Sequence, residues 1–144
     1  MRFIRDAMGR GRLIAAVAGA TVLFAGLAIA HSGDDVHPVF SGALPNVPGK
    51  ALSAVVVNYA PGAKSQVHHH SGSVFAYILK GEIRSQVSGE SEAKVYKAGE
   101  SFFEPPGSSH LVSENASETE PASLLAIFIA DEGATLTMPG EATP

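Results

Sequence analysis

From residue 51 onward, short runs rich in Val, Ile, Tyr and Phe alternate with Gly and Pro at close intervals. No run in this region repeats its apolar residues every 3.6 positions, as an amphipathic helix would. The pattern therefore predicts an all-β fold. Because short antiparallel strands must protect their edges, we expect a double-sheet jelly roll or small barrel that encloses a cavity. The expected strands are 51–59, 65–70, 74–80, 82–88, 93–96, 101–104, 110–114 and 123–130.

Two separated segments carry histidines in a pattern that suggests a metal site. His68 and His70 share one expected strand, and His110 follows a Pro-Pro-Gly turn forty residues later. Side chains alternate along a strand, so His68 and His70 point to one face and His69 points to the other. A third imidazole from a strand nearby in space would complete a three-histidine site. A solvated loop, a fortuitous cluster or an expression tag are the alternatives, although a tag usually lies at a terminus.

The first thirty residues have the composition of a secretory signal peptide. Four Arg lie near the start, residues 13–30 are nearly all apolar, and Ala28-Ile29-Ala30 is a small-x-small cleavage site. We expect cleavage after Ala30 and a periplasmic or secreted protein without stable membrane insertion. An uncleaved anchor is the alternative, because the apolar stretch is at the lower limit for a bilayer span.

The composition excludes several classes of function. The chain has no cysteine, so disulfides and thiolate ligands are ruled out. Cleavage would remove four Arg and one Asp, which changes the net charge from −4 to −7. That charge disfavours nucleic acid and anionic membranes as partners. The expected organisation is a signal peptide at 1–30, an N-terminal arm at 31–50, one β-barrel at 51–130 and a C-terminal tail at 131–144.

Each of the two histidine segments contains further residues at defined distances from its histidines. The first has Gly62, His68, His70, Val74 and Gly81, and the second has Gly99, Pro105, Gly107, His110 and Glu114. Together they resemble the two motifs of the cupin superfamily of small β-barrels. The resemblance implies a double-stranded β-helix, or jelly-roll barrel, in which His68, His70 and His110 bind divalent iron, manganese, nickel, zinc or copper.

Two positions depart from the family pattern. Val74 stands where the family has a metal-ligating Glu, and Glu114 stands where it has Asn. Three neutral imidazoles can still hold a divalent metal and leave positions open for substrate, as in cupin dioxygenases that cleave diketones. Decay of the metal site is the other interpretation.

Other side chains are candidates for the surroundings of the metal. Glu104 shares a strand face with Phe102, so we expect Phe102 at a substrate-binding wall and Glu104 as a catalytic residue. Glu104 could act as a general base, orient a metal-bound water or bond to a ligating imidazole. An edge carboxylate facing solvent is the alternative. Arg84 and Gln86 share another strand face and could reach a substrate, although a charged outer face is the commoner explanation.

The strand at 74–80 also has an outward apolar face. If Val74 points inward, then Phe75, Tyr77 and Leu79 point outward, which favours packing between subunits in a homodimer. The expected function is an exported metal-binding cupin that acts as a dioxygenase on a small organic acid or diketone. A non-catalytic module that binds metal or a small ligand, and a structural remnant with an empty barrel, are the alternatives.

Overall fold

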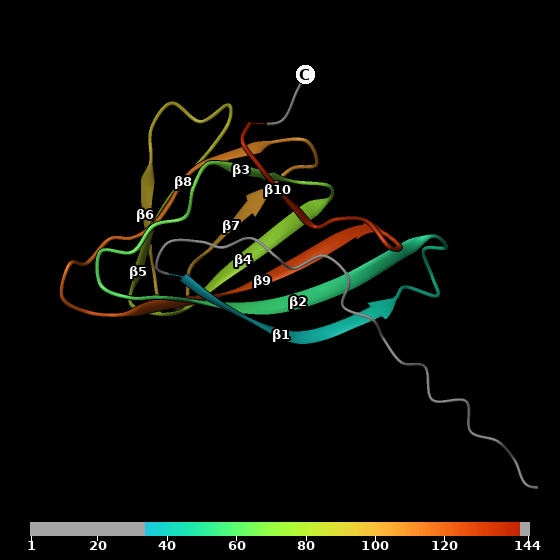
Figure 1. Cartoon of the computed structure of the whole chain (residues 1–144), viewed down its shortest axis with the longest axis horizontal. Coiled ribbons are helices and arrows are strands. Elements are labelled where there is room, and N and C mark those ends of the chain that lie inside the picture. Colours follow the sequence, from blue (N-terminus) through green and yellow to red (C-terminus); the bar gives the residue numbers. More distant parts are fainter. Residues whose placement is uncertain (1–33, 142–144) are drawn as a thin grey trace, which may run out of the picture.

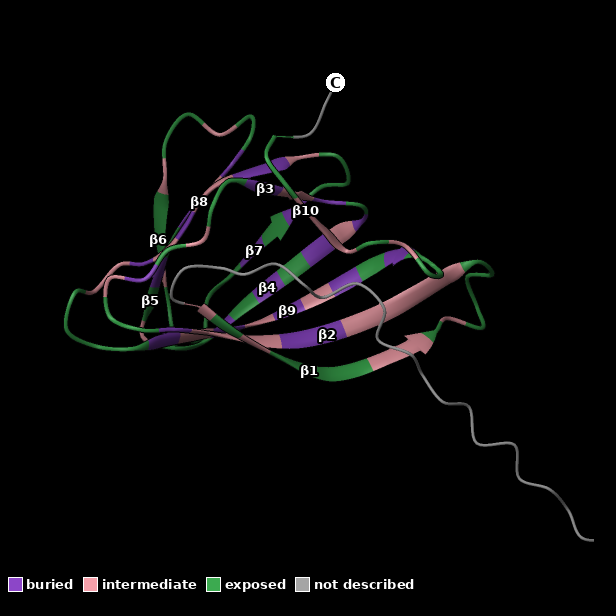
Figure 2. Cartoon of the chain, in the orientation of Figure 1, coloured by how far each residue is buried: buried purple, intermediate pink, exposed green. Residues whose placement is uncertain are grey.

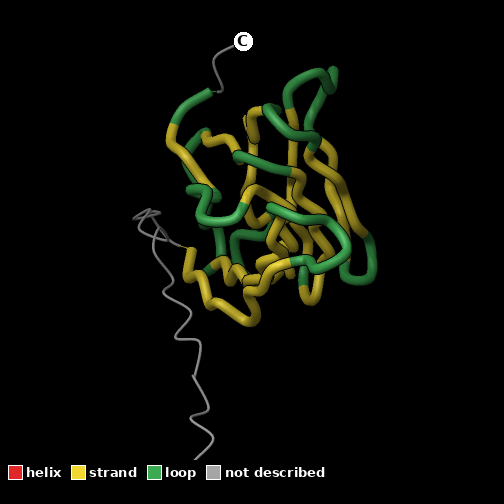
Figure 3. The backbone as a smooth tube through the Cα atoms, turned by 90° about the vertical axis from the view of Figure 1, so that its right-hand side faces the viewer, coloured by secondary structure: helices red, strands yellow, loops and turns green. Residues whose placement is uncertain are grey.

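The computed structural model describes residues 34–141, which form two antiparallel five-stranded sheets that face each other (Figure 1). Figure 3 shows strands and loops, and no helix, in this part of the chain. The first sheet has the order β1 (Asp34–Ala43), β2 (Lys50–Tyr59), β9 (Ala122–Asp131), β4 (Ser73–Lys80) and β7 (Ser101–Glu104). The second has the order β10 (Thr137–Pro139), β3 (His68–His70), β8 (Ser109–Asn115), β5 (Glu82–Val87) and β6 (Lys94–Lys97). The predicted all-β jelly roll is confirmed.

The core lies between the inward faces of the two sheets. Along β4, Val74, Ala76 and Ile78 are buried whereas Phe75 and Tyr77 are exposed, which is the predicted alternation. Figure 2 shows buried and exposed positions alternating along β4. Burial of each large apolar side chain contributes about 1.5–3 kcal/mol relative to exposure. The members of the core include Val55, Ile78, Ile83, Leu124 and Phe128.

The Gly, Pro and Ser residues of the predicted N-terminal arm favour a segment with little structure of its own, but the described part of the arm contains the ten-residue strand β1. β1 pairs with β2 along its length and has an irregularity between Pro38 and Phe40. Proline lacks a backbone donor and is excluded from central strands, but an edge strand accommodates it at a bulge. The Pro, Ser and Gly residues of 34–43 therefore belong to an edge strand, and not to a segment without structure.

The predicted C-terminal tail also contributes to the fold. β10 pairs with β3 in register, so that Thr137 lies opposite His70 and Pro139 lies opposite His68. The predicted strand at 65–70 is shorter than expected, because only His68–His70 form β3. The C-terminal strand thus covers the edge of the short strand that carries two of the three histidines.

The expected signal peptide at 1–30 lies outside the described residues. Within residues 34–141, no helix is long and apolar enough to cross a bilayer.

The connection between β3 and β4 is tightly packed at Gly72. A Cβ atom placed there would lie 2.1 Å from the carbonyl oxygen of Ile129 and 2.9 Å from Cα of Ala130. Such contacts are far inside van der Waals distance, so only glycine fits without displacing β9. This close approach fixes the turn that directly follows His70.

Candidate metal centre

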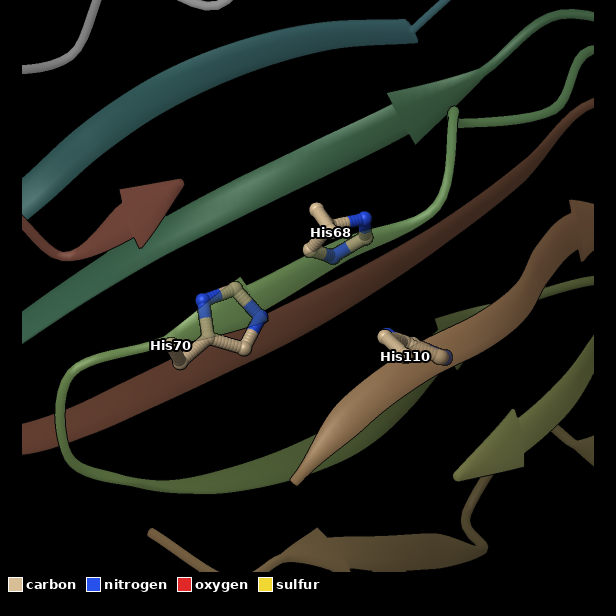
Figure 4. A group of neighbouring side chains, drawn as sticks. All are labelled: His68, His70 and His110. Carbon is tan, nitrogen blue, oxygen red and sulfur yellow. The ribbon is translucent and has the colours of Figure 1, made fainter. Parts of the chain in front are cut away.

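The three predicted histidines come together inside the molecule. His68 and His70 lie on β3, and His110 lies on β8 directly opposite His68 in the register (Figure 4). Each ring offers one nitrogen, and these three atoms lie within 4.8 Å of one another. All three residues are 3–7% exposed. Residues forty positions apart therefore form one buried cluster that could hold a metal ion.

Backbone carbonyl groups orient the two rings on β3. Nδ1 of His68 donates a hydrogen bond to the carbonyl oxygen of Gln66 at 2.7 Å. Nδ1 of His70 donates to the carbonyl oxygen of Leu136 at 3.0 Å and lies 3.1 Å from Oγ1 of Thr137. A neutral imidazole that donates from Nδ1 carries its lone pair on Nε2. These bonds therefore fix the tautomer and the orientation that an imidazole needs in order to bind a metal ion through Nε2.

A buried serine holds the ring of His110. Oγ of Ser85, which is 1% exposed, lies 2.8 Å from Nε2 of His110. Burial and the charges of His68 and His70 lower the pKa of His110 well below its ordinary value. The ring is therefore neutral at neutral pH, which is the state that a metal ligand requires. Sequence reasoning did not single out Ser85, although its position between the apolar residues Ile83 and Val87 indicates an inward side chain.

Glu104 is a buried carboxylate beside the histidines. It is 3% exposed, its Oε1 lies 3.4 Å from Nδ1 of His110, and its Oε2 lies 3.7 Å from Nε2 of His70. Oε2 has no hydrogen-bond partner, and burial raises the pKa of Glu104 to about 8. The structure thus places Glu104 on the inward face with Phe102, and not at a solvent-facing edge.

The donor set fits a divalent transition metal. Three imidazoles and one carboxylate are nitrogen and oxygen ligands of the kind that such ions accept. In an apolar interior the charged form of a carboxyl group is costly unless it is paired or coordinates a metal, which is why burial raises the pKa of Glu104 to about 8 in the absence of a cation. The unpartnered Oε2 of Glu104 is the observation that favours a cation here.

A cavity of about 240 Å³ opens beside the cluster. Its lining contains no Lys or Arg from the described part of the chain. Phe102 contributes to one wall, and its ring centroid lies 5.7 Å from that of His110. The remaining walls are largely apolar and are formed by Val55, Val57, Val74, Ala76, Leu124, Ala126 and Phe128.

A second polar group lines the cavity, and sequence reasoning did not identify it. The hydroxyl of Tyr59 lies 2.8 Å from Oγ of Ser113 and 3.1 Å from Oγ of Ser65, which donates to Oδ2 of Asp34 at 2.7 Å. Burial raises the pKa of Tyr59. Tyr59 could have been found from the alternation along β2, but Asp34 belongs to the strand that the sequence did not predict.

Arg84 and Gln86 do not line the cavity, so their contact with a substrate stays a prediction. Both point away from the cavity, because Ser85 between them faces inward. Nη1 of Arg84 donates to Oε1 of Glu114 at 2.6 Å, and Nε2 of Gln86 donates to the carbonyl oxygen of Glu90. This face of β5 is the charged outer surface that was the alternative.

Solved structures with this fold include several enzymes. An oxalate oxidase in complex with the substrate analogue glycolate has a TM-score of 0.57 and 22% identity, with 74% of this chain and 54% of that chain covered. Bacillus subtilis oxalate decarboxylase, which has Mn(II) centres, has a TM-score of 0.59 and 25% identity, with 77% and 29% covered. A DMSP lyase from Ruegeria pomeroyi DSS-3 has a TM-score of 0.54 and 23% identity, with 61% of this chain and 42% of that chain covered. The chain thus spans about half of these neighbours' length or less.

A search of curated protein sequences gave no match. A family model described as a cupin domain matches residues 55–128, a range that contains all three histidines and Glu104. Together with the two facing sheets and the register between β3 and β8, this match shows that the chain belongs to the cupin family.

Proposed function

We propose that this protein is an exported, metal-dependent dioxygenase whose substrate is a small diketone or a related organic acid. The observation that carries the proposal is the buried cluster of His68, His70 and His110, which together with Glu104 lines a largely apolar cavity. Divalent iron, manganese, nickel, zinc or copper would be held by these residues. When bound, the metal supplies a Lewis acid and, for iron, manganese or copper, a redox centre.

The charges around the cavity favour a monoanionic substrate. Asp34 and Asp35 line the cavity and no Lys or Arg from residues 34–141 does, so the second carboxylate of a dianion such as oxalate would have no cationic partner there. The enolate of a β-diketone carries one charge, and its two oxygens can chelate a cation. Its carbon substituents suit the apolar walls. The oxalate enzymes among the structural neighbours therefore serve as a guide to the fold more than to the substrate.

The protein residues around the cavity orient and desolvate such a substrate. Phe102 and the valine side chains pack against its carbon atoms and exclude water from the reacting bond. Ser85 and the carbonyl oxygens of Gln66 and Leu136 hold the imidazoles in a fixed direction. The hydroxyl of Tyr59 offers a polar contact elsewhere in the lining.

Oxygen uptake with 2,4-pentanedione tests this proposal. Both atoms of O₂ enter the products and one carbon–carbon bond breaks, so one diketone and one O₂ give acetic acid and methylglyoxal without an external reductant. We expect metal-loaded protein to consume O₂ and diketone in a 1:1 ratio, and His110→Ala to abolish the uptake. Stabilisation of the protein by the diketone, with no oxygen uptake under any of the five metals, would contradict the proposed dioxygenase and support a binding module.

The proposal includes removal of residues 1–30 and location in the periplasm or outside the cell. The support is the basic start, the apolar run and the Ala28-Ile29-Ala30 site. N-terminal sequencing of the protein from the periplasmic fraction should begin at His31. Recovery of the uncut chain from the membrane fraction would contradict cleavage.

We also propose that two copies associate through the outer face of the first sheet. An outward row crosses all five strands without a charged residue, because Phe40 pairs with Ala54, Ala54 with Ile127, Ile127 with Phe75, and Phe75 with Phe103. An uncharged face can meet its own copy without like-charge repulsion. Light scattering should give the mass of a dimer, and Phe103→Ser should shift it toward the monomer. A wild-type monomer would contradict the proposal.

A further inference from the structure

The position where the cupin pattern has a ligating Glu is occupied by Val74, but a carboxylate lies directly beside it. Val74 on β4 and Glu104 on β7 are cross-strand partners in the register. Both side chains point inward and are 1% and 3% exposed. Directly opposed residues on one sheet face have Cβ atoms about 4.5–5.5 Å apart. A carboxylate carried by position 104 therefore reaches the same region of the cavity as one carried by position 74.

The distances from the carboxylate oxygens of Glu104 to the histidine nitrogens fit ligands of one metal ion better than partners in a hydrogen bond. Its two oxygens lie 3.4 Å and 3.7 Å from ring nitrogens of His110 and His70, respectively. Hydrogen bonds between nitrogen and oxygen are usually about 2.7–3.2 Å long. Two ligand atoms that are each about 2.1 Å from one metal ion lie about 3.0 Å apart at a right angle and about 3.4 Å apart at a tetrahedral angle.

No group in the described residues satisfies the inner oxygen of this carboxylate. Oε2 of Glu104 is buried without a hydrogen-bond partner, and no Lys or Arg of residues 34–141 lines the cavity. A purely structural Glu at this place would cost free energy because it is desolvated and unpaired. A general base would not need to lie between two imidazoles, whereas a ligand would.

We infer that Glu104 is the fourth protein ligand of the metal, supplied by β7 in place of the Glu that β4 lacks at Val74. The inference rests on the proposed metal site and changes the role expected for Glu104 from catalytic residue to ligand. Three histidines and one carboxylate form a harder ligand set than three histidines alone, and the set carries one negative charge. The added carboxylate therefore favours binding of manganese and iron.

Exchange of the carboxylate between the two strands tests the inference. Mn²⁺ affinity of the untagged mature protein is measured by calorimetric titration for the wild type, Glu104→Ala, Glu104→Gln and the double variant Val74→Glu/Glu104→Ala. Co²⁺ absorption of the same proteins reports the coordination number independently of any activity. Glu114→Ala is the matched control, because that carboxylate pairs with Arg84 on the outer surface.

We expect Glu104→Ala and Glu104→Gln to weaken Mn²⁺ binding by at least about 10–100-fold, the loss typical of residues that only orient metal ligands. The double variant should recover most of this loss, because it returns the carboxylate to the cavity from β4. A structural role for Glu104 would not be rescued in this way. Wild-type affinity in both single variants, with binding still abolished by His110→Ala, would overturn the inference and leave the metal site intact. Failure of the wild type to bind Mn²⁺, Co²⁺, Fe²⁺, Ni²⁺, Zn²⁺ and Cu²⁺ alike would overturn the metal site itself.

Discussion

At the scale of single residues, the cluster depends on what holds each ring as much as on the rings themselves. His68 and His70 are fixed by backbone carbonyl groups, which cannot be removed by a side-chain substitution. His110 has a backbone hydrogen bond with Val112 and a second hydrogen bond with the hydroxyl of Ser85, which can be removed. Ser85 is therefore the position at which ring orientation can be tested without altering a ligand.

Ser85→Ala should weaken metal binding by about 10-fold, because His110 loses the side-chain hydrogen bond that helps to fix its direction. The measurement is a titration of the metal-free protein with Mn²⁺ or Zn²⁺. Ser113→Ala is the matched control, since Ser113 is also a buried serine but bonds to Tyr59. Equal affinities in the two variants would show that Ser85 has no role in positioning the ring.

The buried hydroxyl of Tyr59 predicts a pH dependence of stability. Its pKa is raised in the folded state, chiefly by burial, whereas the unfolded chain has the ordinary value of 10.0. Between these two values the folded protein holds a proton that the unfolded chain has lost, so stability falls as the pH rises above about 10. The contribution is fully present below that pH.

The measurement is urea unfolding of the wild type and Tyr59→Phe from pH 8 to pH 11. Subtracting the free energy of unfolding of the variant from that of the wild type removes the effect of Lys and Arg titration, which the two proteins share. Above pH 10, the free energy of unfolding of the wild type should fall by up to about 1.4 kcal/mol per pH unit more than that of the variant. Parallel curves would mean that Tyr59 ionises normally.

At the scale of elements, the parts that the sequence predicts are those with regular alternation. Val74, Ala76 and Ile78 mark the inward face of β4, and the same period correctly placed Glu104 on the face of Phe102. Alternation alone does not say which face of a strand is inward, so it leaves open on which side Arg84 and Gln86 lie. The apolar Ile83 on the same strand carried the correct signal.

The two strands that the sequence did not predict are defined by pairing more than by composition. β1 contains proline and is an edge strand, and β10 is only three residues long. Neither has an apolar period, because each is stabilised by hydrogen bonds to a neighbour that is distant in the chain. The contacts that Leu136 and Thr137 make with His70 could not be predicted for the same reason.

The turn at Gly72 links one element to the site. Gly72→Ala should lower the free energy of unfolding by about 3 kcal/mol, because its Cβ would overlap the backbone of β9, and should weaken metal binding through the displaced His70. Gly89→Ala is the control, since nothing lies within 4 Å of its Cβ, and backbone strain alone costs about 1 kcal/mol. Urea unfolding and metal titration measure both effects. Unchanged metal affinity in Gly72→Ala would show that this turn does not position His70.

At the scale of the whole molecule, two sheets with apolar inner faces enclose a site that neither could build alone. The second sheet supplies the three histidines, and the first supplies Glu104, Phe102 and most of the apolar wall. The segments that close the cavity come from both ends of the described chain, because Asp34 and Thr137 both line it. The ligand set is therefore a product of the complete fold, and we expect metal and folding to stabilise each other.

Elemental analysis of the untagged mature protein, after loading with a divalent metal and removal of the excess, tests the central claim most directly. The wild type should retain about one equivalent of one transition metal per chain, and His110→Ala should retain almost none. The absence of stoichiometric metal in the folded wild type, after separate loading with iron, manganese, nickel, zinc and copper, would contradict it.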